Sequence, residues 1–294
     1  MSLYALAVWV TSGLVGKQWW VQLACFSLST YLMVELNNGN ALIRVYSRMV
    51  SCAFIMFSCM DCFLFGNMGG GIVQLCSVAT YITLFRCYQD GQSAGWTYYA
   101  FLCVGLASMI FVQVLYFVPF LWLLMHLQLN ALTWRTSVAS LLGLVTPYWF
   151  LLCWIFFEGR YGMLADHFSQ LAKFQSLGDY SQVTLTQCVV VGVVLITGAI
   201  STVHYLRTSF HDKIRVRQLY GFFIIMSFLT LVFMVLQPCH YDPLVRLMIV
   251  NVAPLLAHFF SLTHTRVTNV AFQVIVAVCL FVTVYNLWML LLNS

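Results

Sequence analysis

One set of polar residues in this chain has the side-chain types needed for proton transfer beside a phosphate group. A carboxylate or a histidine can move a proton, and an arginine can hold a phosphate through paired hydrogen bonds. The alternative is that they are ordinary loop charges together with one structural ion pair. The set comprises the candidate catalytic residues Asp61, Asp166 and His167, the candidate phosphate-binding residues Lys17, Arg160 and Arg246, and the supporting residues Glu158, His240 and Asp242.

A second polar group flanks a short polar link. Glu35 ends one apolar run, and Arg44 and Arg48 begin the next. These residues could form a phosphate or head-group site at the cytoplasmic face. We favour an ion pair that fixes a helical hairpin, with the arginines reaching toward anionic lipid.

The cysteine patterns do not predict a metal or redox centre. Cys59 and Cys62 form a single C-x-x-C pair in a chain whose cysteines mostly lie in apolar runs. Cys239, His240 and Asp242 lack the second ligand pair that zinc sites usually contain. We therefore expect no metal and no other cofactor.

Asn251 and His258 are spaced two helical turns apart, with Pro254 between them. They share one face of a predicted helix, and such a stripe can line the path of a transporter with broken helices. A hydrogen-bonded contact between helices is the interpretation that we favour.

The composition indicates the class of protein to which these residues belong. Hydrophobic residues make up 62% of the 294 residues and charged residues only 7%, which is typical of a membrane protein. The net charge of +5 is spread along the chain, so we do not expect nucleic-acid binding. Motifs for ATP hydrolysis and for the familiar hydrolases are absent from the sequence.

Apolar runs of helical length recur along the whole chain, and a spanning helix needs about 20 apolar residues. Gln113 and Pro119 favour a hairpin over one long helix between 96 and 128, which gives about eleven spans. We predict an all-α, polytopic transmembrane helix bundle. The runs lie at 2–16, 19–36, 47–66, 71–88, 96–111, 113–128, 134–157, 184–206, 217–237, 244–262 and 268–291.

The placement of lysine and arginine predicts the orientation, because basic residues concentrate on the cytoplasmic side. The segment 207–217 is the densest in basic residues and should be cytoplasmic. The amino terminus is then inside and the carboxyl terminus outside. The residues assigned to the cytoplasmic side are Arg44, Arg48, Arg86, Arg135, Arg207, Lys213, Arg215, Arg217 and Arg266.

The chain reads as a single membrane domain, 1–294, with one sizeable loop at about 158–183 on the outer side. Leu164, Phe168, Leu171 and Phe174 recur there at helical spacing. This pattern predicts an amphipathic helix that lies on the outer leaflet.

Several short motifs between residues 40 and 157 are similar to those of a known superfamily. They are 40–48 (NALIRVYSR), 84–86 (LFR), 105–107 (GLA) with Pro119, and 143–147 (GLVTP) after Arg135. This part of the chain resembles the membrane core of GT-C-type polyprenyl-phosphate-sugar glycosyltransferases. The resemblance implies a GT-C-like core and a polyprenyl-phosphate-linked substrate.

The chain departs from that superfamily after its first span. Such enzymes carry a catalytic acid on a long loop there, whereas this chain has only Gly16, Lys17 and Gln18. No catalytic acid can be transferred, so we leave open whether the chain is an enzyme. As a whole it also resembles a family of Bacteroidota polytopic inner-membrane proteins with no assigned activity.

These features favour a multi-pass protein of the bacterial inner membrane that acts at the outer face on a polyprenyl-phosphate-linked saccharide, by glycosyl transfer or polymerisation. The alternative is a non-catalytic GT-C-like subunit that partners an envelope-biogenesis or secretion complex. A weaker alternative is a transporter or lipid flippase. The expected partners are membrane lipid, the lipid-linked substrate and a second membrane protein.

Overall fold

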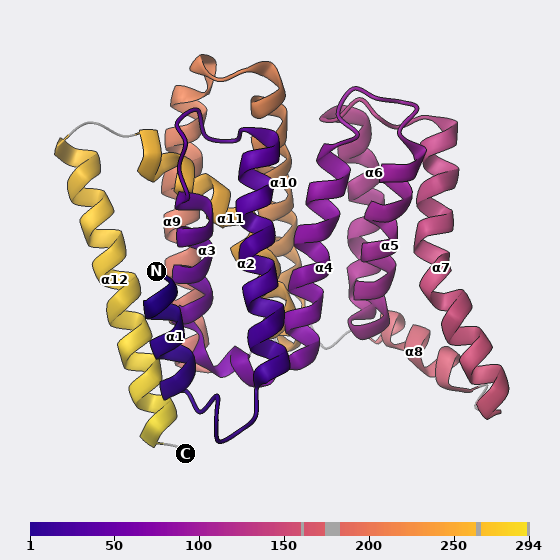
Figure 1. Ribbon diagram of the computed structural model, residues 1–294, viewed down its shortest axis with the longest axis horizontal. Coiled ribbons are helices and arrows are strands. Elements are labelled where there is room, and N and C mark those ends of the chain that lie inside the picture. The colour runs from indigo at the N-terminus through magenta and orange to yellow at the C-terminus, as the bar shows by residue number, and fades with distance from the viewer. Residues whose placement is uncertain (160–161, 174–182, 263–265, 293–294) are drawn as a thin grey trace. The chain divides into compact units, whose positions relative to one another are not determined.

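The computed structural model describes residues 1–159, 162–173, 183–262 and 266–292. Every regular element in these ranges is a helix, so the prediction of an all-helical protein is confirmed (Figure 1). The α-helices are α1 (Ser2–Thr11), α2 (Trp20–Asn40), α3 (Met49–Met60), α4 (Met68–Phe85), α5 (Ala94–Ile110), α6 (Val118–Leu127), α7 (Trp134–Glu158), α8 (Gly162–Ala172), α9 (Leu185–Thr208), α10 (Ile214–Leu236), α11 (Tyr241–Leu262) and α12 (Arg266–Leu292). Short 3-10 helices are η1 (Cys62–Gly66), η2 (Val112–Phe117), η3 (Ser209–His211) and η4 (Pro238–His240).

Several of these helices are long and apolar enough to cross a membrane. In the described part of the chain the six that qualify lie at Met68–Phe85, Trp134–Glu158, Leu185–His211, Ile214–Leu236, Pro238–Leu262 and Thr268–Leu292. Four apolar stretches are shorter, at Ser2–Thr11, Met49–Met60, Ala94–Ile110 and Val112–Leu127. These lengths and compositions are those of a helical membrane bundle.

The chain forms two compact units, and one of the two boundaries between them falls within α4. Unit 1 comprises Met1–Gly71 and Tyr180–Ser294, and unit 2 comprises Ile72–Asp179.

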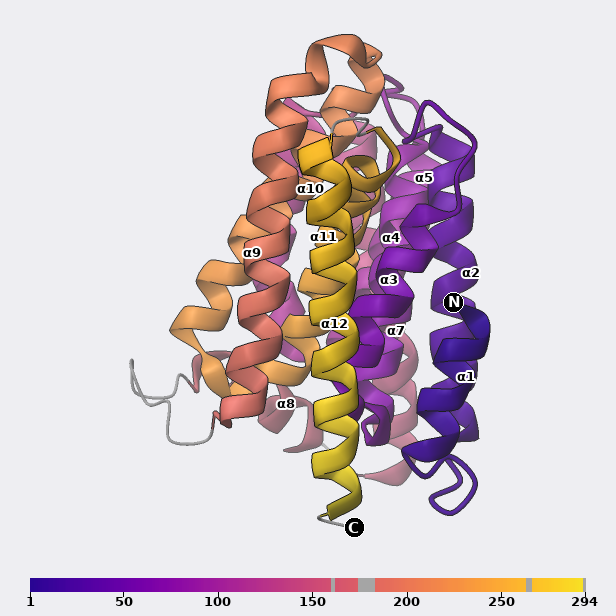
Figure 2. The ribbon, with the colours of Figure 1, turned by 90° about the vertical axis from the view of Figure 1, so that its left-hand side faces the viewer.

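Unit 1 is built around α11, which contacts α3, α9 and α10. Its residues from Leu244 to Phe259 are all buried. A helix that is apolar on every side is stable only when other helices surround it. Figure 2 shows α12 running alongside α9, and these two helices are in contact.

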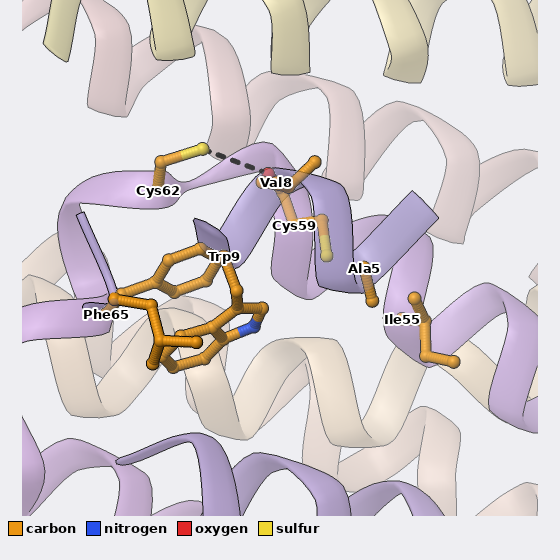
Figure 3. Packing of buried hydrophobic residues seen from close by; sticks show 8 residues of the cluster. Ala5, Val8, Trp9, Ile55, Cys59, Cys62 and Phe65 are labelled. Atoms are coloured by element: carbon orange, nitrogen blue, oxygen red, sulfur yellow. Dashed lines mark hydrogen bonds between the residues drawn. The ribbon is translucent and has the colours of Figure 1, made fainter. Parts of the chain in front are cut away.

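The amino-terminal helix packs on α3 and η1. The Trp9 and Phe65 rings stack with their centroids 4.0 Å apart. Cys59 and Cys62 lie in the same apolar cluster, which Figure 3 shows from close by. Both thiols are free and buried, and they fill space beside these aromatic rings.

The predicted apolar run 47–66 is not one continuous helix. It is divided at Asp61, where the backbone leaves the helical conformation (φ −107°, ψ 78°) between α3 and η1. Asp61 thereby lies at a helix end and not within a helix.

In unit 2 the run 96–128 turns back on itself, as Gln113 and Pro119 indicated. The helix α5 ends at Ile110, η2 follows, and Pro119 lies in the first turn of α6. Phe101 of α5 contacts Trp122 of α6, with ring centroids 6.4 Å apart, so the two helices lie side by side.

The helices α5 and α7 approach each other closely through glycine. A Cβ atom added at Gly105 would lie 2.8 Å from the carbonyl oxygen of Leu144. One added at Gly143 would overlap the carbonyl group of Tyr98. Small residues allow helix backbones to approach in this way, which is a common device in membrane bundles.

The helix expected in the segment 158–183 is present as α8, Gly162–Ala172. It contains Leu164, Phe168 and Leu171, whereas Phe174 lies outside the described residues.

Candidate functional site

The first candidate site is a polar cluster at the start of α11. We call it the Asp61–Arg246 cluster, and it comprises Asp61, Asn67, Tyr241, Asp242 and Arg246. Asp61 follows α3, Asn67 precedes α4, and the other three belong to the first turns of α11. All these residues belong to unit 1.

Hydrogen bonds connect the members of this cluster in two groups. The Tyr241 hydroxyl donates to Oδ2 of Asp61 at 2.5 Å. The Arg246 Nε donates to Oδ1 of Asp242 at 2.5 Å, and its Nη2 donates to the carbonyl of Leu64. The Asn67 amide donates to the other oxygen of Asp242.

Three members of the cluster, Asp61, Tyr241 and Arg246, are buried, whereas Asp242 is partly exposed and Asn67 is exposed. Asp61 is 1% exposed and Arg246 is 9% exposed. A Cβ atom at Gly70 would lie 2.7 Å from both Arg246 Nε and Asp242 Oδ1. The backbone of α4 therefore approaches the ion pair at a point where only glycine fits.

This geometry determines what the cluster can do. Arg246 already donates to Asp242 and Leu64, so a phosphate bound by this guanidinium would compete with those contacts. Asp61 is a buried acid that receives one hydroxyl donor, which is an arrangement that can hold a proton or an ion pair in place.

The other predicted residues of unit 1 lie outside these contacts. The Lys17 ammonium lies 4.9 Å from the centroid of the Trp19 ring. His240 packs against Phe233, with ring centroids 6.5 Å apart.

Four predicted residues fall within the range of unit 2, and three of them are among the described residues. His167 Nε2 lies 3.0 Å from the carbonyl oxygen of Ser108, and the Ser108 hydroxyl meets the Tyr148 hydroxyl at 2.7 Å. Asp166 and Glu158 are exposed. Arg160 lies outside the described residues. The structure thus brings together Asp61, Asp242 and Arg246 from the predicted set, with Tyr241 and Asn67 as partners that the sequence analysis missed. A tyrosine directly before Asp242 was the available signal for the first of these.

A second feature of unit 1 is an apolar groove between α9 and α10 over α11. We call it the α9–α10 groove, and it has two sections of about 260 and 310 Å³ that share Leu195 and Leu231. On α9 it extends from Gln187 to Val203. This distance is about 24 Å at the helical rise per residue.

Glycine opens the groove. A Cβ atom at Gly192 would have no neighbour within 4 Å, whereas one at Gly198 would lie 3.1 Å from Val252. Tyr241, the hydroxyl donor to Asp61, lines the end of the groove where α9 begins.

A second polar cluster lies at the opposite end of α11. We call it the Asp212–His258 cluster, and it comprises Arg44, Tyr205, Asp212, Tyr220 and His258. Arg44 Nε lies 2.6 Å from Oδ1 of Asp212, and His258 Nε2 lies 3.2 Å from Oδ2. The rings of Tyr205 and Tyr220 each have their centroid 5.1 Å from that of His258.

This cluster changes the interpretation of Arg44. The sequence analysis favoured an ion pair within the hairpin that contains Glu35, but the structure pairs Arg44 with Asp212 from a distant segment. Asp212 was missed altogether. It is the single acidic residue within the basic segment 207–217, and that isolation was the available signal.

Comparison with known proteins gives no match: no family model, no curated protein and no solved structure matches this chain.

Proposed function

We propose that this chain is a multi-pass protein of the bacterial inner membrane that binds a polyprenyl-phosphate-linked saccharide and acts on it at the outer face. The observation that carries the proposal is the α9–α10 groove, in which the isoprenoid chain would lie.

The dimensions and the lining of the groove support a hydrocarbon occupant. Its length of about 24 Å covers most of a hydrocarbon layer about 30 Å thick. Its lining is dominated by aliphatic residues from helices of spanning length. In a bilayer such a groove is filled by a lipid chain, because an empty apolar groove would forfeit dispersion contacts.

The end of the groove at Tyr241 supports the placement of an anionic head group there. Gln187 and Cys188 in the first turn of α9 line this end. The amino-terminal end of a helix carries a partial positive charge that favours phosphate. In this proposal the phosphate lies at the first turn of α9 beside Tyr241, whose hydroxyl donates to Asp61.

The proposed topology has eleven spans, with the amino terminus inside and the carboxyl terminus outside. The four shorter apolar stretches and α2 would supply the five spans beyond the six long ones. The start of α11 and the segment 158–183 would then lie outside, with α8 on the outer leaflet. A GT-C-like arrangement of residues 40–157 belongs to the same proposal.

Filling the groove tests the proposal. The substitution Gly192→Trp adds an indole to the groove wall at a position where a Cβ atom has no neighbour within 4 Å, so the indole should fill the groove and leave the helix packing intact. Ile196→Trp is the matched control, because Ile196 lies on the same helix, is exposed and does not line the groove. Both variants would be reconstituted in lipid nanodiscs with a photoreactive polyprenyl phosphate.

We expect crosslinking to fall several-fold in Gly192→Trp and to stay at the wild-type level in Ile196→Trp. Excess unlabelled polyprenyl phosphate should displace the probe, and excess phospholipid should not. Equal crosslinking in the two variants, or equal displacement by phospholipid, would discard the proposal.

One observation favours a second candidate function, a non-catalytic subunit of a membrane complex. Arg246 and Asp242 of the Asp61–Arg246 cluster bond to each other, as expected of a structural ion pair. Co-purification in mild detergent decides between the two functions. A stable stoichiometric partner supports the subunit, and an isolated protein that processes the lipid-linked saccharide supports the first proposal.

A further inference from the structure

The Asp212–His258 cluster is an acid–base pair buried within unit 1. The side chains of Asp212 and His258 are 1% and 0% exposed, whereas that of Arg44 is 41% exposed. Ionisable residues inside a membrane bundle are costly, and they often belong to proton or ion pathways. The proposed lipid site lies at the opposite end of α11, so this cluster is independent of it.

The contacts of Asp212 determine which nitrogen of His258 carries the proton. One carboxylate oxygen accepts from Arg44 and the other faces His258 Nε2. A carboxylate only accepts hydrogen bonds, so a neutral His258 must carry its hydrogen on Nε2. Its Nδ1 is then unprotonated and has a lone pair that can accept a proton.

Several polar atoms beside His258, and others deeper along α11, are buried and lack a hydrogen-bond partner among the described residues. They are His258 Nδ1, His204 Nδ1, the Tyr220 hydroxyl and both amide atoms of Asn251. Buried polar groups in proteins normally have partners, so such a concentration indicates a place that accommodates water or protons. Asn251 lies about 10 Å deeper than His258 along α11.

The charged and titratable groups that surround the pair come from each neighbouring segment. The helix α9 supplies His204 and Tyr205, with a ring-centroid distance of 6.4 Å from His204 to His258. The helix α10 supplies Tyr220, and the Tyr205 hydroxyl donates to the carbonyl of Arg217 on the same helix. The segment before α3 supplies Arg44.

We propose that Asp212 and His258 form a proton-binding site that exchanges protons with the solution at the Arg44 end of the bundle. Water delivers a proton to Nδ1 of His258, and the resulting imidazolium is balanced by the Asp212 carboxylate. Release reverses the step, and no other bond changes. An aspartate stabilises an imidazolium in the same way beside the histidine of a hydrolase triad.

The charge balance explains the part played by Arg44. With His258 neutral, the Asp212 carboxylate and the Arg44 guanidinium cancel. A protonated His258 shares the carboxylate with Arg44, so the two cations compete for one anion. Removing the charge of Arg44 should therefore strengthen proton binding at His258.

The test is a pH titration of the full-length protein in lipid nanodiscs, followed by nitrogen-15 NMR of labelled histidine. The substitution His258→Gln identifies the signal. We expect this signal to change from the neutral Nε2–H form to the imidazolium as the pH falls. Arg44→Gln should raise the midpoint by about one pH unit or more, and Asp212→Asn should lower it.

Arg48→Gln is the matched control, because Arg48 is an exposed arginine four residues from Arg44. It should leave the midpoint unchanged. A purely structural pair would keep His258 in the neutral form at every pH at which the protein is folded. That result, or a midpoint that does not respond to Arg44→Gln, overturns the proposal.

Discussion

Replacing Arg246 by methionine tests whether Arg246 and Asp242 form a structural ion pair. Methionine keeps much of the side-chain length and removes the guanidinium. The substitution leaves Oδ1 of Asp242 and the carbonyl of Leu64 without this donor. Asp242 keeps its contact with Asn67.

The expected loss of stability follows from the burial of the Arg246–Asp242 pair. Removing one partner of a fully buried ion pair costs about 3–5 kcal/mol. The side chains of Arg246 and Asp242 are 10% and 20% exposed, so the lower end of that range applies. We expect Arg246→Met to reduce the free energy of unfolding by about 3 kcal/mol. Adding Asp242→Asn removes the uncompensated charge, so the double variant should recover about 1–3 kcal/mol relative to the sum of the single variants.

The assay is equilibrium unfolding in bicelles of the wild type, both single variants and the double variant. Lys17→Met is the control, because Lys17 is exposed and its contact with Trp19 is worth only about 0.5–1 kcal/mol. Additivity of the two single effects within about 0.5 kcal/mol would show that the residues do not interact, and would refute this reasoning.

Two further predictions concern the packing of unit 2 and the orientation of the chain. Gly143→Ala should destabilise the protein by about 1–3 kcal/mol, because the added Cβ would meet the backbone of α5. This Cβ would lie 3.0 Å from the backbone nitrogen of Leu102 and would overlap the carbonyl of Tyr98. Gly95→Ala, which has open space around it, should not destabilise, and equal thermal unfolding of the two variants in nanodiscs would contradict the packing. A cysteine introduced within 158–183 should react with a membrane-impermeant maleimide on intact cells stripped of their outer membrane. Labelling only after lysis would place this segment in the cytosol and reverse the proposed topology.

The helices were predictable because hydrocarbon imposes a simple length requirement on apolar runs. The same requirement does not locate breaks within a run. Asp61 divides one run into α3 and η1, and its partner Tyr241 comes from a segment far away in the sequence. The amphipathic period of α8 was readable because it depends only on local spacing.

The polar clusters show the same difference between contacts that follow from local spacing and contacts between distant segments. Asp242 and Arg246 are one helical turn apart, so their pairing follows from helical geometry. Asp212 pairs with Arg44 and His258, which lie in distant parts of the chain. No local pattern links these residues, and a single acid in a basic segment resembles an ordinary surface charge. Long-range pairing of this kind requires the fold.

The most direct test of the central claim is an electron cryomicroscopy map of the protein in nanodiscs that contain polyprenyl phosphate. We expect one unbranched chain to follow α9 past Gly192, with its phosphate at the first turn of α9 beside Tyr241. Two-chain phospholipid in the groove, or polyprenyl density elsewhere on the bundle, would contradict the account.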